Sequence, residues 1–194
     1  GRQFLLHYQA QITNGKLTGA EVLVRWLHPV RGMVSPADFI PLAEETGLIL
    51  PLGQWMLETA CLQLAQWATQ PGMDHLTVAV NVSARQFSQS DFVDQVLGVV
   101  KTTDVNPQRL KLELTESMLV ANVEEIIAKM LLLKANGIGF SLDDFGTGYS
   151  SLTYLRRLPL HTLKIDQSFV HGMMGDSGDL AIVQGVIGLA RSFG

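Results

Sequence analysis

The chain has 194 residues, of which 47% are hydrophobic and 16% charged, and this composition excludes a disordered polymer. The formal net charge of −4 argues against a surface that coats nucleic acid, so we expect no nucleic-acid polymer as a partner. The apolar runs fall far short of the ~20 residues that a membrane span needs. The single cysteine, Cys61, excludes an internal disulfide framework.

The chain opens with Gly1, without an initiator Met or a signal peptide, and a strand-like segment follows almost at once. We therefore expect residues 1–194 to be a single domain of a longer protein.

The first two strand-like segments are Phe4–Gln9 and Gly19–Trp26. Between them lies Asn14-Gly15, a dipeptide that favours a tight hairpin, so we expect these two strands to be antiparallel. Later strand-like segments follow at Leu76–Asn81, Leu110–Glu113, Gly139–Asp144 and Thr162–Asp166.

Helical segments separate most of these strands. Ser35–Asp38 reads as a helix start with a proline at the first helical position and a capping-box acid, and Gly47 as the helix stop. Apolar residues at helical spacing predict further helices around Leu52–Trp67, Phe92–Val100, Ile126–Leu131, Ser151–Leu158 and Leu180–Ala190, the third of these stopped by Asn136-Gly137.

From the second strand onward, strands and helices alternate, which implies parallel strands with helical crossovers. This α/β pattern suits a (β/α) barrel, and a doubly wound open sheet is the alternative. An ordinary eight-fold barrel does not begin with an antiparallel hairpin.

Polar side chains stand near the carboxyl ends of the predicted strands. Since side chains alternate faces along a strand, Glu21, Leu23 and Arg25 share one face of the second strand, opposite Val22 and Val24. On the later strands the polar residues are Asn81, Glu113, Asp143 with Asp144, and Lys164. Active sites of barrels lie on this side. The alternative is a structural layer in which these side chains form salt bridges only with one another. For Asp143 and Asp144 the alternative is a turn exposed to solvent.

Glu21, Asn81, Glu113 and Asp143 offer only oxygen ligands, which select Mg²⁺ or Mn²⁺ over Zn²⁺, and Asp144 could hold a second ion. Two such ions can clamp the oxygens of a phosphoryl displacement. The planar fork of Arg25 suits a phosphate oxygen, and Lys164 could neutralise developing charge or hold the attacking water. The reaction class that fits is metal-assisted phosphodiester hydrolysis.

Five motifs in the same order resemble the EAL domain family, the phosphodiesterases and receptors of the bacterial second messenger cyclic di-GMP. The motifs are Glu21–Trp26 with His28-Pro29, Asn81–Arg85, Glu113–Ser117, Asp143–Leu152 and Leu163–Asp166. The resemblance implies a TIM-like (β/α)8 barrel with an antiparallel first strand. Because that family continues with two more strand–helix units, it also implies that this chain is truncated after about six strands.

The resemblance further implies a role for each matching position. Glu21, Asn81, Glu113 and Asp143 would be metal ligands for Mg²⁺ or Mn²⁺, with Asp144 contributing to a second metal and Glu21 and Lys164 acting in catalysis. Arg25, Leu23 and Gln9 would contact the cyclic di-GMP. Glu116 would anchor a mobile loop at Gly146–Ser151, and His28 would shape the turn after its strand.

Two functions follow as alternatives. The first is a phosphodiesterase that opens cyclic di-GMP to linear pGpG, and the second is a catalytically inactive EAL domain that serves as a receptor or interaction module. Val22 replaces the alanine of the naming motif, and Gln9-Ala10 replaces a usual glutamine–proline pair. The resemblance also implies a homodimer, further regulatory domains in the parent chain, and a cytoplasmic location, with membrane tethering only through other domains.

Overall fold

The computed structural model describes residues 3–120, 122–146 and 152–193. In these residues a seven-stranded sheet has the order β1-β2-β4-β5-β6-β7, with β3 paired to the outer part of β2. The pairs β1–β2 and β2–β3 are antiparallel and the others parallel. The strands are β1 (Phe4–Thr13), β2 (Lys16–His28), β3 (Gly32–Val34), β4 (Thr77–Asn81), β5 (Leu110–Thr115), β6 (Gly139–Phe145) and β7 (Thr162–Ile165).

The predicted hairpin between the first two strands is confirmed. Asn14 and Gly15 both have positive φ, 50° and 75°, as a two-residue hairpin turn requires. Both strands are longer than predicted, because the two-stranded ladder continues past the apolar core into polar sequence. The short strand β3 was not predicted; it pairs with the end of β2 after a turn in which His28 Nδ1 accepts hydrogen bonds from the N–H groups of Val30 and Arg31, both at 3.1 Å.

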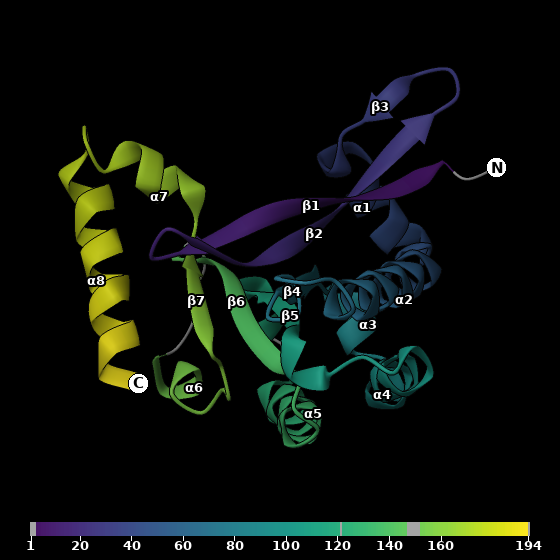
Figure 1. Ribbon diagram of the computed structural model, residues 1–194. Coiled ribbons are helices and arrows are strands. Elements are labelled where there is room, and N and C mark those ends of the chain that lie inside the picture. Colours follow the sequence, from purple (N-terminus) through teal and green to yellow (C-terminus); the bar gives the residue numbers. More distant parts are fainter. Residues whose placement is uncertain (1–2, 121, 147–151, 194) are drawn as a thin grey trace.

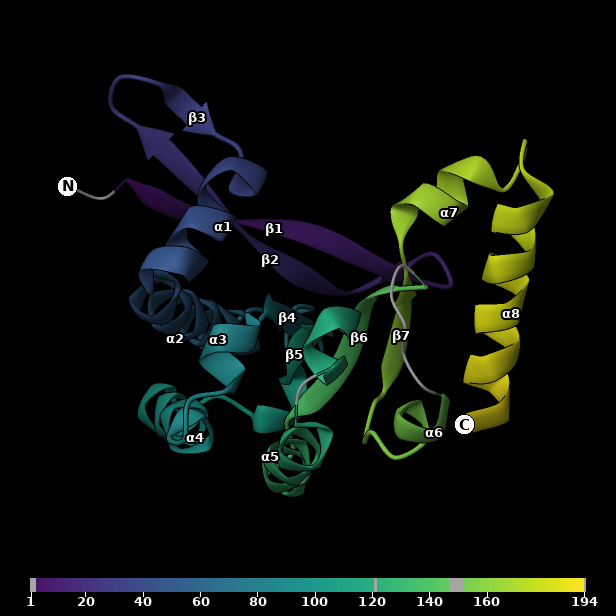
Figure 2. The same cartoon turned by 180° about the vertical axis from the view of Figure 1, so that it is seen from behind.

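The helices form an arc around the strands, as Figures 1 and 2 show, with α2, α4, α5, α6 and α8 following one another in chain order. The α-helices are α1 (Pro36–Thr46), α2 (Ile49–Ala68), α3 (Ala84–Phe87), α4 (Phe92–Thr103), α5 (Val123–Ala135), α6 (Leu152–Leu155), α7 (Gln167–Gly172) and α8 (Ser177–Phe193), and 3₁₀ turns lie at η1 (Pro107–Arg109) and η2 (Glu116–Val120).

One face of the sheet carries the main core, and we call it the helix face. Its central row is Val22, Val80, Leu112 and Phe140, which lie opposite one another in register. These residues are at most 2% exposed and belong to one cluster with buried residues of α2, α4, α5 and α8. Burial of this kind contributes ~25 cal/mol per Å² of apolar surface, so it fixes which face each strand turns to the helices.

The strand order decides between the two architectures that the sequence left open. Strands β2 to β7 follow one another without the reversal of a doubly wound sheet, and the helices share one core on one face. The TIM-like barrel with an antiparallel first strand is therefore confirmed. Among the described residues the sheet is not closed, since β1 and β7 stand at its two ends.

The helices predicted from apolar spacing are present, but not all of their apolar residues are buried, and two other details differ. Leu131 on α5 is 52% exposed, and Leu180 and Ile187 on α8 are 40% and 41% exposed. The buried apolar residues are Val123, Ile127, Met130 and Leu133 on α5 and Val183 and Val186 on α8. The Ser35 side chain makes no capping hydrogen bond at the start of α1. The helix predicted at Ser151–Leu158 is shorter, and Ser151 lies outside the described residues.

Candidate metal centre

The register of the parallel strands lines up polar residues on the face opposite the helices, which we call the site face. Asn81 of β4 lies opposite Glu113 of β5, and Thr115 lies opposite Asp143 of β6. Glu21 of β2 lies opposite Ala79, two residues before Asn81. Since the carboxyl ends of parallel strands meet at one edge, the sheet gathers these side chains there.

Lys164 stands at the centre of the gathered carboxylates. Its Nζ atom lies 2.9 Å from Glu21 Oε2, 2.8 Å from Glu113 Oε2 and 2.8 Å from Asp143 Oδ2. Oxygens of the three carboxylates lie within 4.8 Å of one another. We call Glu21, Glu113, Asp143 and Lys164 the carboxylate cluster. It joins residues that are up to 143 positions apart in the sequence.

Asn81 forms a hydrogen bond with the carboxylate cluster. Its Nδ2 donates to Glu21 Oε1 at 2.9 Å, so each oxygen of the Glu21 carboxylate accepts one hydrogen bond, the other coming from Lys164. The structure thus brings together all four residues predicted as principal ligands, and Lys164 with them.

A bulge in β6 separates the two neighbouring aspartates. Leu142 pairs with Leu163 and Phe145 pairs with Ile165, so Asp143 and Asp144 together oppose the single residue Lys164. Asp144 adopts a positive φ of 54° within this bulge. The structure therefore leaves Asp144 outside the group of three carboxylates and beside Asp166, whose side chain it hydrogen-bonds.

The electrostatics of the cluster follow from burial and charge. Burial raises the pKa of Glu113 to about 7, opposed by the hydrogen bond from Lys164 and helped by the charge of Glu21. Burial by itself lowers the pKa of Lys164, but the hydrogen bonds to Asp143, Glu113 and Glu21 together outweigh it and raise that pKa. The pKa of Asp144 is raised by burial and by the charges of Asp143 and Asp166.

Glu116 lies in η2, directly after β5, and is 4% exposed. Its Oε2 accepts a hydrogen bond of 3.1 Å from the backbone N–H of Gly146, directly after β6. This is the contact expected of a loop anchor. Residues 147–151 of the predicted loop lie outside the described residues.

The three predicted ligand-contacting residues lie on the site face of the antiparallel pair. Gln9 lies opposite Glu21, and Leu23 and Arg25 follow on the same face of β2 because side chains alternate along a strand. Arg25 Nη1 donates to the backbone carbonyl of its neighbour Val24 at 2.9 Å. These three residues flank the carboxylate cluster on β1 and β2.

The donor set fits a hard divalent cation. Three carboxylates and one side-chain amide supply only oxygen ligands, and no histidine or cysteine belongs to the carboxylate group found in the described residues. Such a set suits Mg²⁺ or Mn²⁺, which bind carboxylate and carbonyl oxygens.

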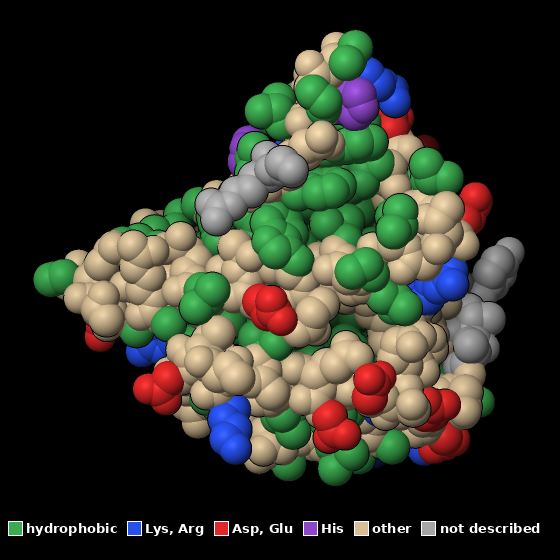
Figure 3. All heavy atoms as spheres, turned by 90° about the vertical axis from the view of Figure 1, so that its right-hand side faces the viewer, with side chains coloured by type: hydrophobic (Ala, Val, Ile, Leu, Met, Phe, Trp, Pro, Cys, Tyr) green, Lys and Arg blue, Asp and Glu red, His purple; other side chains and the backbone are tan. Residues whose placement is uncertain are grey.

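Two hollows lie away from this centre. The larger, about 1020 Å³, is visible among the hydrophobic side chains near the N-terminal residues in Figure 3. Its lining is mostly apolar and comes from β1, β2, α1 and α2, including Phe4, Leu6, Trp26, Phe39, Leu52 and Trp55. It lacks titratable side chains, so it offers no chemistry for phosphoryl transfer.

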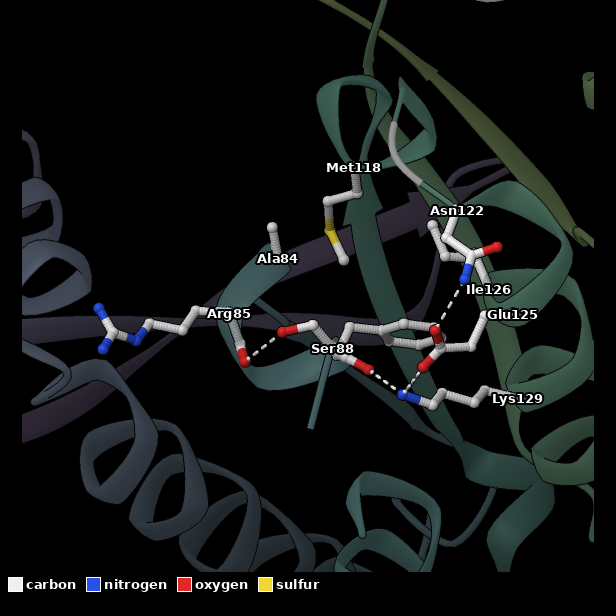
Figure 4. A pocket seen from close by; sticks show the side chains of 9 residues that line it. Ala84, Arg85, Ser88, Met118, Asn122, Glu125, Ile126 and Lys129 are labelled. Carbon is white, nitrogen blue, oxygen red and sulfur yellow. Dashed lines mark hydrogen bonds and ion pairs between the residues drawn. The ribbon is translucent and has the colours of Figure 1, made fainter. Parts of the chain in front are cut away.

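The smaller hollow, about 340 Å³, lies between α3, η2 and α5. Figure 4 shows Lys129 at its edge, where the ammonium pairs with Glu125 at 2.8 Å. The same ammonium donates to the carbonyls of Phe87 and Gln89, both at 2.9 Å. All three of its donors are used, so Lys129 ties α5 to the segment after α3.

Sequence reasoning missed three residues that shape this region. Asp166 interacts with Asp144, Lys129 holds α5, and Arg85 Nη1 donates to the backbone carbonyls of Glu44 and Glu45 at the end of α1. Asp166 and Arg85 stand within the motifs quoted above, which was the available signal. Lys129 gave none, because a lysine on a helix is ordinarily exposed.

The chain matches a known protein family. Residues 1–194 match the family model described as the EAL domain. This chain belongs to the EAL domain family.

This EAL domain is 44% identical over 193 residues to the bifunctional diguanylate cyclase/cyclic di-GMP phosphodiesterase MucR of Pseudomonas aeruginosa, covering 98% of this chain and 28% of MucR. It is also 44% identical to a cyclic di-GMP phosphodiesterase of the same organism, covering 98% of this chain and 32% of that protein. The chain therefore spans about a third or less of the length of these curated relatives.

A solved structure of the PaMucR phosphodiesterase in complex with c-di-GMP superposes with a TM-score of 0.95. The identity is 43%, and the match covers 99% of this EAL domain and 78% of that chain. Among the described residues of this EAL domain, no helix is both long enough and apolar enough to cross a bilayer.

Proposed function

We propose that this EAL domain hydrolyses cyclic di-GMP to linear pGpG with the help of Mg²⁺ or Mn²⁺. The observation that carries the proposal is the convergence of Glu21, Glu113 and Asp143 around Lys164, with oxygens of the three carboxylates within 4.8 Å of one another. The names of the two relatives, which are 44% identical over nearly the whole chain, support the same substrate and reaction.

Glu21, Asn81, Glu113 and Asp143 would hold the first metal ion, and Asp144 would contribute to a second. Ions bound there supply a Lewis acid for a phosphoryl oxygen and lower the pKa of a water molecule. This division is supported by the membership of Asp143, but not Asp144, in the group of three carboxylates, and by the interaction of Asp144 with Asp166.

We assign Lys164 and Arg25 as the two cationic side chains that interact with the negatively charged phosphate groups of the substrate. Lys164 carries three N–H donors on a flexible stem, so it can hold a water oxygen or neutralise charge that develops on the phosphate. Arg25 presents a planar fork that matches two phosphate oxygens, and its position on the site face of β2 supports this role. Leu23 and Gln9 would line the bound dinucleotide beside it.

The proposal is tested by turnover of cyclic di-GMP by the intact protein with Mg²⁺ or Mn²⁺, with linear pGpG as the measured product. Glu21→Gln removes one ligand charge and is expected to abolish turnover. Glu58→Gln is the matched control, since Glu58 is an exposed residue of α2 that pairs with Gln54 at 2.6 Å, and it is expected to retain activity. Binding of cyclic di-GMP without turnover would contradict the enzyme and identify a receptor.

We also infer the surroundings in which the domain works. Relatives that are three or more times longer support further domains in the parent protein, as sensory or regulatory parts. A homodimer that uses the region after β6, and a cytoplasmic location where cyclic di-GMP is made, complete the proposal. Sedimentation of the intact protein tests the dimer.

A further inference from the structure

We propose that Lys164 is an internal competitor of the divalent cation, so that the ion must displace the lysine ammonium from the carboxylate cluster before it can bind. This inference rests on the proposed function, because it concerns how the same site is controlled.

The contacts of Lys164 carry the first step. An ammonium group has three N–H donors, and here all three are used, by Glu21, Glu113 and Asp143 at 2.9, 2.8 and 2.8 Å. Each contact is a charge-assisted hydrogen bond, and the side chain is 25% exposed. The ammonium therefore occupies the point at which the three carboxylates converge.

A divalent cation needs the same oxygens. The carboxylate oxygens lie within 4.8 Å of one another, and Mg²⁺ binds oxygen at about 2.0–2.1 Å. An ion that drew these three ligands in would lie where the ammonium lies, and the two positive charges would repel each other at short range. The two cations therefore exclude each other from this position.

The local structure allows the Lys164 side chain to leave the carboxylate cluster. Lys164 is carried by β7, a strand of only four residues. The β6 bulge leaves Lys164 opposite two residues, so the strand pairing on that side is interrupted. Its four-carbon stem can move the ammonium without a change of the backbone.

The same contacts of Lys164 also hold the three carboxylates together. Three carboxylates meet one ammonium, and the Glu113 side chain is only 1% exposed. Without a cation at the centre, the carboxylates would repel one another. Lys164 thus stabilises the ligand set in the arrangement that the metal uses, and the cost is weaker metal affinity. Loss of Lys164 is expected to tighten metal binding even though it removes a residue that we assign to catalysis.

The test is titration calorimetry of Mn²⁺ into the intact protein after treatment with a chelator. Lys164→Met is expected to bind Mn²⁺ about tenfold more tightly than the wild type, because a competing cation is gone. Lys101→Met, which removes the same charge from an exposed position of α4, is the control and is expected to leave the affinity within about twofold. Equal or weaker binding by Lys164→Met would overturn the inference.

A second measurement uses the wild type, since Lys164→Met leaves the three carboxylates without their shared ammonium and could fold poorly. Reductive methylation followed by peptide mass spectrometry reports how fast each lysine reacts. Lys164 is expected to react several-fold faster with Mg²⁺ than without it, whereas Lys111, which lies on β5 outside the carboxylate cluster, is expected to react at an unchanged rate. A Lys164 rate that does not respond to Mg²⁺ would contradict the displacement.

These readouts are separate from turnover. Tighter Mn²⁺ binding by Lys164→Met, together with a wild type that never cleaves cyclic di-GMP, would support the inference and contradict the proposed function. Turnover of cyclic di-GMP by the wild type, together with an unchanged Mn²⁺ affinity in Lys164→Met, would support the proposed function and contradict the inference. Absence of Mn²⁺ binding by both proteins would overturn the inference together with the metal site.

Discussion

The buried carboxylate of Glu116 accepts a hydrogen bond of 3.1 Å from the backbone N–H of Gly146. Glu116 directly follows the strand that carries Glu113, and Gly146 directly follows the strand that carries Asp143. The bond therefore ties together the ends of two strands that each supply one carboxylate to the cluster. Its strength bears on how firmly those two carboxylates are held.

Glu116→Ala removes this tie and leaves the Gly146 N–H without its carboxylate. A hydrogen bond to a charged group contributes about 1.5–3 kcal/mol, so we expect the free energy of unfolding to fall by roughly 2 kcal/mol. Glu116→Gln keeps an acceptor oxygen and is expected to lose about half as much. Urea unfolding of the three proteins checks this, and equal losses in Ala and Gln would contradict the role of the hydrogen bond.

Gly146→Ala tests the backbone at the same place. Gly146 has a φ of 104°, which L-residues rarely adopt, and an added Cβ would lie 3.0 Å from Phe169 Cε2 and 3.4 Å from Ile182 Cγ2. We expect a loss of about 1–3 kcal/mol in the free energy of unfolding. Gly98→Ala is the matched control, because a Cβ there meets nothing within 4 Å and the residue lies within α4. That control is expected to stabilise the protein by about 0.5–1 kcal/mol, and a larger loss there than at Gly146 would refute the argument.

Addition of Mg²⁺ or Mn²⁺ is expected to stabilise the protein, because a ligand that binds only the folded state raises its stability. At a metal concentration of 100 Kd the gain is about 2.7 kcal/mol, seen as a higher melting temperature that a chelator reverses. Glu113→Gln is expected to lose most of this metal-dependent shift, whereas Glu58→Gln is expected to keep it. A full shift in Glu113→Gln would show that the ion binds elsewhere.

His161 makes the stability depend on pH. The ring Nδ1 of His161 accepts a hydrogen bond of 3.2 Å from the backbone N–H of Phe140, and the backbone N–H of His161 donates to the Phe140 carbonyl at 2.9 Å. Burial, and then the charges of Lys134 and Lys111, lower the pKa of this histidine. Well above pH 6.5 the ring is neutral in both the folded and the unfolded chain, so its contribution to stability is constant.

As the pH falls below about 6.5, the unfolded chain takes up a proton at this residue before the folded chain does, so stability decreases until the lowered folded pKa is passed. His161→Asn keeps an acceptor for Phe140 but cannot be protonated. We expect its unfolding free energy to fall less steeply than that of the wild type as the pH drops below about 6.5, as measured by urea unfolding at each pH. Parallel curves for the two proteins would contradict this assignment.

Lys129 and Lys134 lie on the same helix, α5, and differ in their surroundings. Lys129 is 9% exposed and donates to Phe87 and Gln89, while Lys134 is exposed and reaches the Pro159 carbonyl only at 3.4 Å. Lys129→Met leaves the buried Phe87 carbonyl without the ammonium, although the Gln89 carbonyl still accepts from the N–H of Phe92, and is expected to cost roughly 2–4 kcal/mol in unfolding free energy. Lys134→Met is expected to stay within about 0.5 kcal/mol. Similar losses in the two variants, measured by urea unfolding, would disprove the distinction.

Much of the candidate site could be predicted from local patterns in the sequence. The Asn14-Gly15 turn determined an antiparallel start, because both residues tolerate the positive φ that such a turn needs. Alternation along β2 correctly assigned Glu21 and Arg25 to the face opposite Val22, since that rule depends only on the geometry of one strand. The positions of Asn81, Glu113 and Asp143 near strand ends followed from the bounds of the strand-like segments.

The tertiary structure alone decided how these side chains meet. Nothing in the sequence places the Lys164 ammonium between Glu21, Glu113 and Asp143, because that contact depends on the register of strands up to 143 positions apart. The bulge that separates Asp143 from Asp144 is likewise a property of the β6–β7 pairing and not of either strand. Patterns within one segment determine which face a residue takes, whereas the packing of distant segments determines which residues it touches.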